Sequence, residues 1–216
     1  LEGDYLEEMH VGKILSFIEN SRATAVVIGP GLWRLDKTRN AINTLVEKIN
    51  LPMVIDADAI RAVGAIKDKL KGKSIVLTPH AEELMELTGV KVTENIKERI
   101  DTVRKEAYKI NCGKDDTCPL YPPITIVLKG NVDVISNGKD IILNDTGAPE
   151  MTKGGCGDTL TGIAGALLAR KIDTFNAGAG AAYMNGKAGE LAVKKYGEGL
   201  LPTDLIEEIP KVIQNG

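Results

Sequence analysis

The chain of 216 residues carries 27 Lys and Arg against 30 Asp and Glu, which gives a formal net charge of −3. With 43% hydrophobic and 26% charged residues it has the composition of a globular protein, which excludes a disordered or collagen-like chain. Scattered Lys and Arg and only 4% aromatic residues argue against nucleic-acid binding, and no uninterrupted apolar stretch is long enough for a membrane span.

The first half of the chain alternates helical and strand patterns. Short β-branched runs that end at Gly, Asp or Pro predict buried strands at residues 24–28, 52–55 and 75–77. Apolar residues at helical spacing predict helices over 4–19, 37–49, 81–88 and 93–110.

The second half opens with a loop at 111–123 and a strand at 124–128. Asn137-Gly138 separates two β-rich runs at 132–136 and 141–144, which is a strong signal for a hairpin. The remaining elements are helices expected over 158–170, 174–195 and 203–213.

Strands that alternate with helices predict an α/β fold with a parallel sheet covered on both faces. Ligands of such sheets bind beyond the carboxyl ends of the strands. Polar groups and glycines gather at four predicted strand ends, namely Gly29-Pro30-Gly31, Asp56 with Asp58, Thr78 with His80, and Lys129-Gly130. We therefore expect a binding site at this edge of the sheet.

The three cysteines are Cys112, Cys118 and Cys156. The count is odd and the acidic first ten residues are not a signal peptide, so we expect a reducing, cytoplasmic setting and free thiols. The short spacing between Cys112 and Cys118 leaves a disulfide between them open.

A glycine-rich stretch at 154–157 precedes an apolar helix. Its glycines and the helix N-terminus together predict a hole for an anion. Asp158 in the first turn is either a catalytic base or a cap of this helix. The stretch is neither a phosphate-binding Walker loop nor a dinucleotide fingerprint.

The strand ends each allow two interpretations. Lys129 either meets a nucleotide phosphate or is a surface lysine before a turn, and His80 either contacts a substrate or simply starts a helix. Asp56 and Asp58 could hold Mg²⁺ through waters, but for Asp58 we favour a cap of the short helix that follows. Gly29 and Gly31 form a turn or let a ligand approach the backbone.

Five motifs occur in one order along the chain: VVIGPGL, VIDADAI, VLTPHAEEL, VLKG and NDTGAPEMTKGGCGDTLTGI. From about residue 26 to 183 the chain resembles the ADP- or ATP-dependent NAD(P)H-hydrate dehydratases, which are lyases of metabolite repair. The resemblance implies a ribokinase-like three-layer sandwich, with a mostly parallel sheet, helices on both faces and a β-hairpin in the C-terminal half. It also implies one ribokinase-like domain over 1–216 that lacks the family's glycine-rich N-terminal part, and a homotetramer in the cytoplasm.

The resemblance further implies the reaction. A nucleotide, ADP or ATP with Mg²⁺, phosphorylates the C6 hydroxyl of the S form of NADH-hydrate or NADPH-hydrate, and loss of phosphate restores NAD(P)H. Asp158 matches the base, and Gly155, Cys156 and Gly157 match the anion hole. Substrate contacts match Gly29, Gly31, His80 and Asp158. Nucleotide contacts match Lys129, Gly130, Asn131, Val132, Asp133 and Gly157, and no residue is assigned as a metal ligand.

Two positions depart from the family pattern. Asp133 stands where the family usually has Thr, and Ala81-Glu82 replaces the usual Pro-Gly after the histidine, while Glu83 is kept. Two other functions remain open: a kinase of the same fold acting on a vitamin precursor or sugar, and a nucleotide-binding regulatory module without catalysis.

Overall fold

The computed structural model describes residues 3–113, 117–120 and 123–215. Six strands form one sheet in the order β1-β2-β3-β4-β5-β6. The strands are β1 (Val26–Ile28), β2 (Met53–Ile55), β3 (Ile75–Leu77), β4 (Ile124–Leu128), β5 (Asp133–Ser136) and β6 (Ile141–Asn144). The first four are parallel, whereas β5 and β6 run antiparallel to their neighbours as a hairpin. The predicted sheet and hairpin are confirmed.

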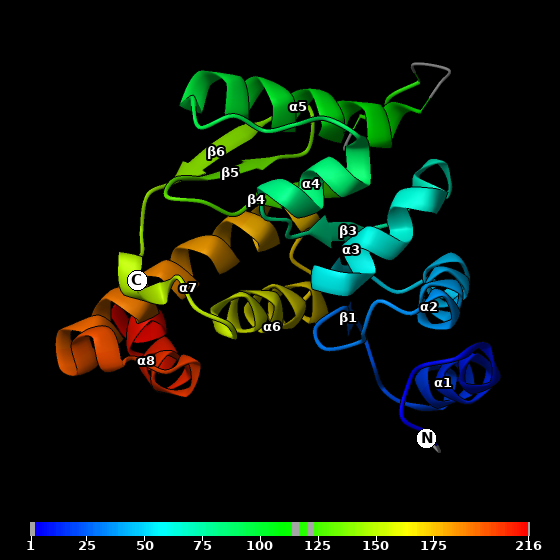
Figure 1. The fold of residues 1–216 in the computed structure, drawn as a ribbon, viewed down its shortest axis with the longest axis horizontal. Helices are drawn as coiled ribbons and strands as arrows, with labels where there is room; N and C mark the ends of the chain where they lie inside the picture. Colours follow the sequence, from blue (N-terminus) through cyan, green and yellow to red (C-terminus); the bar gives the residue numbers. More distant parts are fainter. Residues whose placement is uncertain (1–2, 114–116, 121–122, 216) are drawn as a thin grey trace.

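Helices connect and flank these strands (Figure 1). They are α1 (Glu8–Asn20), α2 (Asp36–Lys48), α3 (Ala57–Val63), α4 (Ala81–Thr88), α5 (Ile96–Cys112), α6 (Cys156–Ala169), α7 (Thr174–Tyr196) and α8 (Pro202–Asn215). Short 3₁₀ turns occupy Gly64–Lys69, Pro149–Met151 and Gly197–Gly199. None of the helices in the described ranges is both long and apolar enough to cross a bilayer.

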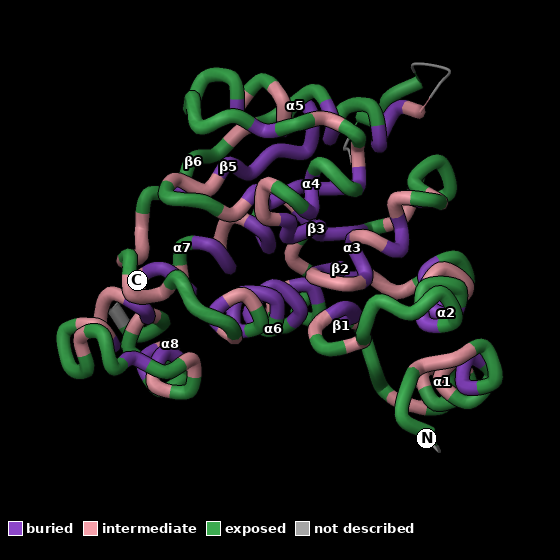
Figure 2. The backbone as a smooth tube through the Cα atoms, in the orientation of Figure 1, coloured by how far each residue is buried: buried purple, intermediate pink, exposed green. Residues whose placement is uncertain are grey.

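Successive strand residues point to opposite faces of the sheet, so two cores form. Met53, Ile55 and Leu77 belong to the core that includes residues of α1 to α5. Val54 and Val76 belong to the other, which α6 and α7 complete. In Figure 1 α6 and α7 lie on one side of the sheet and α4 and α5 on the other, and Figure 2 shows β2 and β3 buried between them. This is the expected three-layer sandwich.

The hairpin turn is held by local polar groups. The side-chain oxygen of Asn137 accepts hydrogen bonds from the N–H groups of Lys139 and Asp140, at 2.9 and 2.7 Å. Gly138 has φ +93° and lies against the backbone of α5, where a Cβ would be 2.6 Å from Tyr108. A glycine is therefore required there both for its conformation and for the close approach.

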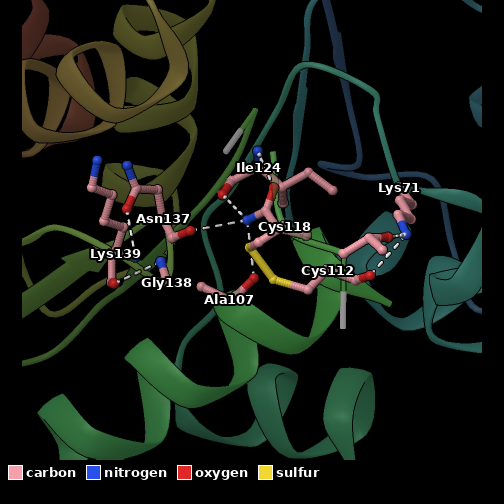
Figure 3. Close-up of a disulfide and its surroundings, with 11 residues drawn as sticks. Lys71, Ala107, Cys112, Cys118, Ile124, Asn137, Gly138 and Lys139 are labelled. Carbon is pink, nitrogen blue, oxygen red and sulfur yellow. Dashed lines mark hydrogen bonds between the residues drawn. A yellow bond between two sulfur atoms is a disulfide. The ribbon is translucent and has the colours of Figure 1, made fainter. Parts of the chain in front are cut away.

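The end of α5 contradicts the expectation of free thiols. Cys112, the last residue of the helix, forms a disulfide with Cys118 (Figure 3). Lys71 donates hydrogen bonds to the carbonyl oxygen of Cys112 and to Thr117, both at 2.8 Å. The two Cα atoms lie 4.1 Å apart. The expectation of free thiols rested on the redox compartment, which does not determine such local geometry.

Candidate active site

The carboxyl ends of β1 to β4 meet at one edge of the sheet, as predicted, and Asp56 is the residue that joins them. It follows β2, and only 2% of its surface is exposed. Its backbone N–H donates to the carbonyl of Ile28 at the end of β1. Ala57, the next residue, has φ +48°, a conformation that is strained for a residue with a side chain.

Three side chains donate hydrogen bonds to the Asp56 carboxylate. Thr78, after β3, and Lys129, after β4, both reach Oδ1 at 2.8 Å. Thr161, in α6, reaches Oδ2 at 3.0 Å. The carboxylate therefore ties the ends of three neighbouring strands to the helix that follows the glycine-rich stretch.

The ammonium of Lys129 lies between two buried carboxylates. Besides its ion pair with Asp56 it is 3.7 Å from Oε2 of Glu83, whose side chain is 7% exposed. Its own side chain is 23% exposed. Lys129 is thus not the solvated surface lysine of the alternative interpretation, and its charge is neutralised within the site.

His80 is the N-cap of α4. Its Nδ1 accepts hydrogen bonds from the backbone N–H groups of Glu82 and Glu83, at 3.2 and 3.3 Å. Because Nδ1 is an acceptor, the ring proton is assigned to Nε2. Nε2 lies 3.3 Å from Oε1 of Glu83, and Oε2 of Glu83 accepts from the N–H of His80, which completes a capping box.

The glycine-rich stretch forms the N-terminus of α6. Gly155 is the N-cap, in the left-handed conformation at φ +98°, and no side chain caps the helix. The first N–H groups of α6, which no carbonyl of the helix can satisfy, are open to an anion. Gly157 lies next to the Asp56–Lys129 pair, since a Cβ there would be 3.6 Å from Nζ of Lys129. The predicted anion hole is therefore next to the strand ends.

Asp158 lies in the first turn of α6 but is not its cap. Its side chain is exposed, and within the described ranges its carboxylate has no hydrogen-bond partner. The adjacent Cys156 is buried, and burial raises the pKa of its thiol, with the charges of Lys153 and Asp158 acting in opposite directions. The thiol stays protonated at neutral pH, which leaves Asp158 as the group of this turn able to take up a proton.

The 129–133 turn between β4 and β5 is held from within. Oδ1 of Asp133 accepts from the N–H of Gly130 and Oδ2 accepts from the amide of Asn144, both at 3.0 Å. Burial raises the pKa of the Asp133 carboxyl, although these hydrogen bonds and the charges of Lys129 and Arg99 oppose the shift. Asp133, which replaces the threonine of the family pattern, thus stabilises the 129–133 turn through these hydrogen bonds.

A cavity of about 430 Å³ lies beside this turn. Its walls include His80, Lys129, Gly130, Asn131, Val132 and, unexpectedly, Arg99. The fold thus brings the predicted histidine and the predicted nucleotide segment to one cavity.

Gly29 and Gly31 lie elsewhere. Gly29 has φ +142° and packs against Asp56, where a Cβ would be 1.8 Å from the backbone oxygen. Both glycines line a separate cavity of about 440 Å³ with Tyr5 and Trp33. The backbone that approaches Gly29 is therefore that of Asp56, and Gly31 is the glycine with open space around it.

Asp58 does not have the role we favoured for it. The N-cap position of α3 belongs to Asp56, and Asp58 lies inside the helix. Its carboxylate accepts from the N–H of Trp33 at 3.1 Å and pairs with Arg34 at 3.2 Å. Asp56 and Asp58 thus point to different partners, and in the described part of the chain no three His, Cys, Asp or Glu side chains converge as a metal site.

Three residues of the site were given no role from sequence. Thr161 lies one helical turn after Gly157, and Glu83 lies three residues after the helix-starting His80, so both had a positional signal. Arg99 precedes the buried Val103 by four residues, which places a charged residue on the buried face of a predicted helix. A charged residue on the buried face of a helix was therefore the sequence signal that could have pointed to Arg99.

The model of the NAD(P)H-hydrate dehydratase family matches residues 4–211. The chain belongs to this family. A bifunctional NAD(P)H-hydrate repair enzyme Nnr from Pyrobaculum aerophilum is 38% identical over 99% of this chain and 40% of its own length. An ADP-dependent (S)-NAD(P)H-hydrate dehydratase from Cenarchaeum symbiosum is 38% identical over 88% of this chain and 62% of its own length. This chain therefore spans less than two thirds of either relative.

Solved structures agree with the assignment. The ADP/ATP-dependent NAD(P)H-hydrate dehydratase from Bacillus subtilis, co-crystallised with ATP and Mg²⁺, is 30% identical and has a TM-score of 0.69, with 89% of this chain and 64% of that chain covered. A ribokinase-like superfamily protein from Enterococcus faecalis is 22% identical with a TM-score of 0.72, over 97% of this chain and 69% of that chain, and supports the ribokinase-like fold. These matches do not favour the small-molecule kinase.

Proposed function

We propose that the protein to which this chain belongs restores NAD(P)H from the S form of NAD(P)H-hydrate in a nucleotide-dependent dehydration, and so acts as a lyase of metabolite repair. The observation that carries the proposal is the family match over residues 4–211. It is supported by the uncapped N-terminus of α6, which lies next to the Asp56–Lys129 pair as transfer of a phosphoryl group requires.

The residues of this turn can perform the two chemical steps. Asp158, exposed and without a hydrogen-bond partner in the described ranges, accepts the proton of the C6 hydroxyl as that oxygen attacks the terminal phosphorus of the nucleotide. The N–H groups of Gly155, Cys156 and Gly157 stabilise the charge on the transferred phosphoryl oxygens. The bond between the terminal phosphorus and the nucleotide breaks in this step, which releases AMP from ADP or ADP from ATP. The C6–O bond then breaks with phosphate as the leaving group, a proton leaves C5, and the C5=C6 double bond of the dihydronicotinamide forms.

We assign the substrate to the rim of strand ends, with His80 and Asp158 as contacts and Gly31 as a further contact from the separate cavity after β1. The cap fixes the imidazole of His80 with its proton on Nε2, at 44% side-chain exposure, so that Nε2 can donate to a hydroxyl or carboxamide oxygen. Gly29 supports this rim by its close approach to Asp56. The preference between NADH-hydrate and NADPH-hydrate is to be measured with both.

We assign the nucleotide, ADP or ATP, to the cavity beside residues 129–133 and to Gly157. The ADP-dependent name of a relative and the ATP/Mg²⁺ co-crystal of the Bacillus subtilis enzyme support nucleotide use. The described residues offer no preformed metal cage, so we propose that Mg²⁺ arrives on the nucleotide phosphates. Such an ion would neutralise phosphate charge during transfer.

We propose that residues 1–216 form one ribokinase-like domain. We also propose that the open edge of its sheet is covered by the N-terminal part that the family resemblance implies. Strand β1 is an edge of the sheet, and Val27 in it is 45% exposed. Tyr5 and Trp33, beside the cavity at this edge, are 41% and 63% exposed. An exposed strand edge with apolar neighbours is usually covered in a whole protein.

We further propose a cytoplasmic homo-oligomer, a tetramer by resemblance. Ile206 and Ile213 lie seven residues apart on one face of α8 and are 52% and 62% exposed. Leu201, just before the helix, is 58% exposed. Exposed apolar residues on one helix face are typical of an interface. Light scattering after size-exclusion chromatography would give the oligomeric state, and a monomer at micromolar concentration would contradict the proposal.

The test of the function is recovery of NADH. The full-length protein is incubated with Mg²⁺ and chemically hydrated NADH, with ADP and ATP added in separate reactions, and the NADH absorbance is followed. We expect a rise that requires nucleotide, and the more effective nucleotide is the donor. If absorbance does not rise although nucleotide binds, the dehydratase is ruled out and alcohol substrates of kinases become the next test.

A further inference from the structure

The cavity beside the 129–133 turn contains a buried arginine. Arg99, in α5, is 7% exposed and lines this cavity. Its Nη2 donates to the carbonyl oxygen of Lys129 at 3.2 Å, and no carboxylate of the described residues forms an ion pair with it. A guanidinium has five N–H donors, so most of its capacity is unused. Because a buried charge without a counter-charge is unfavourable, an anionic ligand is expected here.

Lys129, the cation expected from sequence to meet phosphate, is already paired. Its ammonium is 2.8 Å from Asp56 and 3.7 Å from Glu83, both of them buried. Moving it to a ligand would leave two buried carboxylates without a counter-charge, which is costly in a protein interior. Arg99 is therefore the cation of this cavity that remains available.

The turn is shaped to admit the guanidinium. A Cβ on Gly130 would lie 2.4 Å from Nη2 of Arg99, so a side chain at this position would displace the arginine. Asp133 is close enough for its charge to interact with Arg99, but its oxygens accept from Gly130 and Asn144 instead. Glu82 and Glu94, also on the cavity wall, are exposed and screened by solvent.

We propose that Arg99 is the residue that binds the phosphate groups of the nucleotide, by donating paired N–H groups to their oxygens. A planar guanidinium matches two phosphate oxygens at once, which an ammonium does not. The inference rests on the proposed nucleotide-dependent function and deepens it. The dinucleotide substrate also carries a pyrophosphate, and we assign Arg99 to the nucleotide because it lies against the turn given to that ligand.

The test compares ADP with adenosine, which lacks phosphate, by calorimetric titration of the full-length protein and its Arg99→Gln variant. We expect the Kd for ADP to rise about 10- to 100-fold, the range of a charge-assisted hydrogen bond, with the Kd for adenosine unchanged. Arg104→Gln, an exposed arginine of the same helix, is the matched control and should bind both ligands as before. Arg99→Lys should lie between, because it keeps the charge and loses the planar fork.

Three outcomes would overturn the assignment. The first is an unchanged Kd for ADP in Arg99→Gln. The second is an equal loss of affinity for adenosine, which would mean that the arginine only supports the turn. The third is a loss of affinity that affects NADH and not ADP. If Arg99→Gln does not fold, as judged by its thermal transition, Arg99→Lys decides, and a wild-type Kd for ADP in that variant overturns the proposal. NADH recovery by the unaltered protein tests the proposed function separately, so failure of one does not imply failure of the other.

Discussion

The two aspartates closest to the chemistry differ in what surrounds them. Asp56 is 2% exposed and accepts hydrogen bonds from Thr78, Lys129 and Thr161. Asp158 is exposed, and in the described part of the chain its carboxylate has no hydrogen bond. A carboxylate whose oxygens are all engaged organises its surroundings, whereas one free of partners can accept a proton. Their hydrogen bonds therefore support the proposal that Asp56 organises the site and that Asp158 is the base.

Replacing Asp158 by Asn should remove the proposed base and little else. We expect nucleotide-dependent NADH recovery to fall about 10²- to 10⁴-fold, the usual contribution of a general base. The thermal transition and the Kd for ADP should be unchanged, because the carboxylate makes no hydrogen bond within the described ranges. Activity close to that of the unaltered protein would reject Asp158 as the base.

Removing the ammonium of Lys129 should destabilise the fold. Lys129→Ala leaves Asp56 and Glu83 without their shared cation, and we expect the free energy of unfolding to fall by about 3 kcal/mol. Lys187→Ala is the control, since its ion pair with Glu190 is solvated and should contribute little to the free energy of unfolding. Urea unfolding of both variants measures the difference, and equal losses would refute the buried pair.

Helix starts in this protein fall into two groups. Asn95 and Asp173 cap α5 and α7 with side-chain oxygens, and His80 caps α4 with a ring nitrogen. The start of α6, at Gly155, has no side-chain cap. An uncapped N-terminus keeps its N–H groups and positive dipole for a ligand, at a cost in stability that capped helices do not have. The helices α2 and α3 also begin without a side-chain cap. What distinguishes α6 is that its open N-terminus lies next to the Asp56–Lys129 pair.

The cap of α7 gives a prediction with a pH dependence. Burial raises the pKa of Asp173, but hydrogen bonds from Asn176 and Phe175 outweigh it, so the pKa lies below the ordinary 3.8. Asp173→Ala should lower the free energy of unfolding by about 1 kcal/mol at pH 7. Because the folded-state pKa is lowered, this stabilisation is complete above the ordinary value and is lost as the pH falls through the folded-state pKa.

Thermal unfolding between pH 3 and pH 7 would measure this difference. Asp173→Asn is the control, because an asparagine caps as well and does not titrate, so its stability relative to Ala should not vary with pH. If the stability difference between the unaltered protein and Asp173→Ala grew as the pH fell, the proposed lowering of the Asp173 pKa would be contradicted.

The disulfide at the end of α5 should stabilise the protein by lowering the conformational entropy of the unfolded chain. It closes a loop between residues separated by 6 positions, for which the chain-entropy relation gives about 2 kcal/mol. We expect Cys118→Ser to lower the melting temperature by about 5 °C. A reductant should lower the melting temperature of the unaltered protein to that of the variant and leave the variant unchanged. If the reductant has no effect on the unaltered protein, the bond is absent in solution.

At the scale of the whole molecule, the layers approach closely where a helix presents glycine to the sheet. A Cβ on Gly165 of α6 would be 2.4 Å from Val27, and one on Gly178 of α7 would be 2.9 Å from Val127. These contacts bring α6 and its open N-terminus down onto the strand ends. The position of the site thus depends on the packing distance between layers.

Two glycines test this distance. Gly178→Ala should destabilise the protein by about 2 kcal/mol, because Val127 is fully buried and stiff and cannot move aside. Gly162→Ala is the control, since it has open space in the same kind of helix and should stabilise by up to about 1 kcal/mol. Denaturant unfolding would compare the two, and a neutral Gly178→Ala would mean that the layers can separate freely.

The sequence alone determined the elements, the layering and the edge of the sheet that carries the site. β4 and α4 were predicted at their observed bounds, because local periodicity and turn residues act over a few positions. The glycine-rich motif and its neighbours indicated the family without any coordinates. These features are local, so a single sequence contains them.

The tertiary structure alone decided the partners of the charged groups. Lys129 pairs with Asp56, 73 residues away, and Thr161 meets Asp56 across 105 residues. Arg99 lines the cavity beside the 129–133 turn. All three depend on how distant segments pack. The same holds for Asp58, which bonds Trp33 instead of capping its helix, and for Cys112, which pairs with Cys118. Hydrogen bonds and ion pairs are set by distances of a few ångströms in the folded chain, and sequence patterns do not contain those distances.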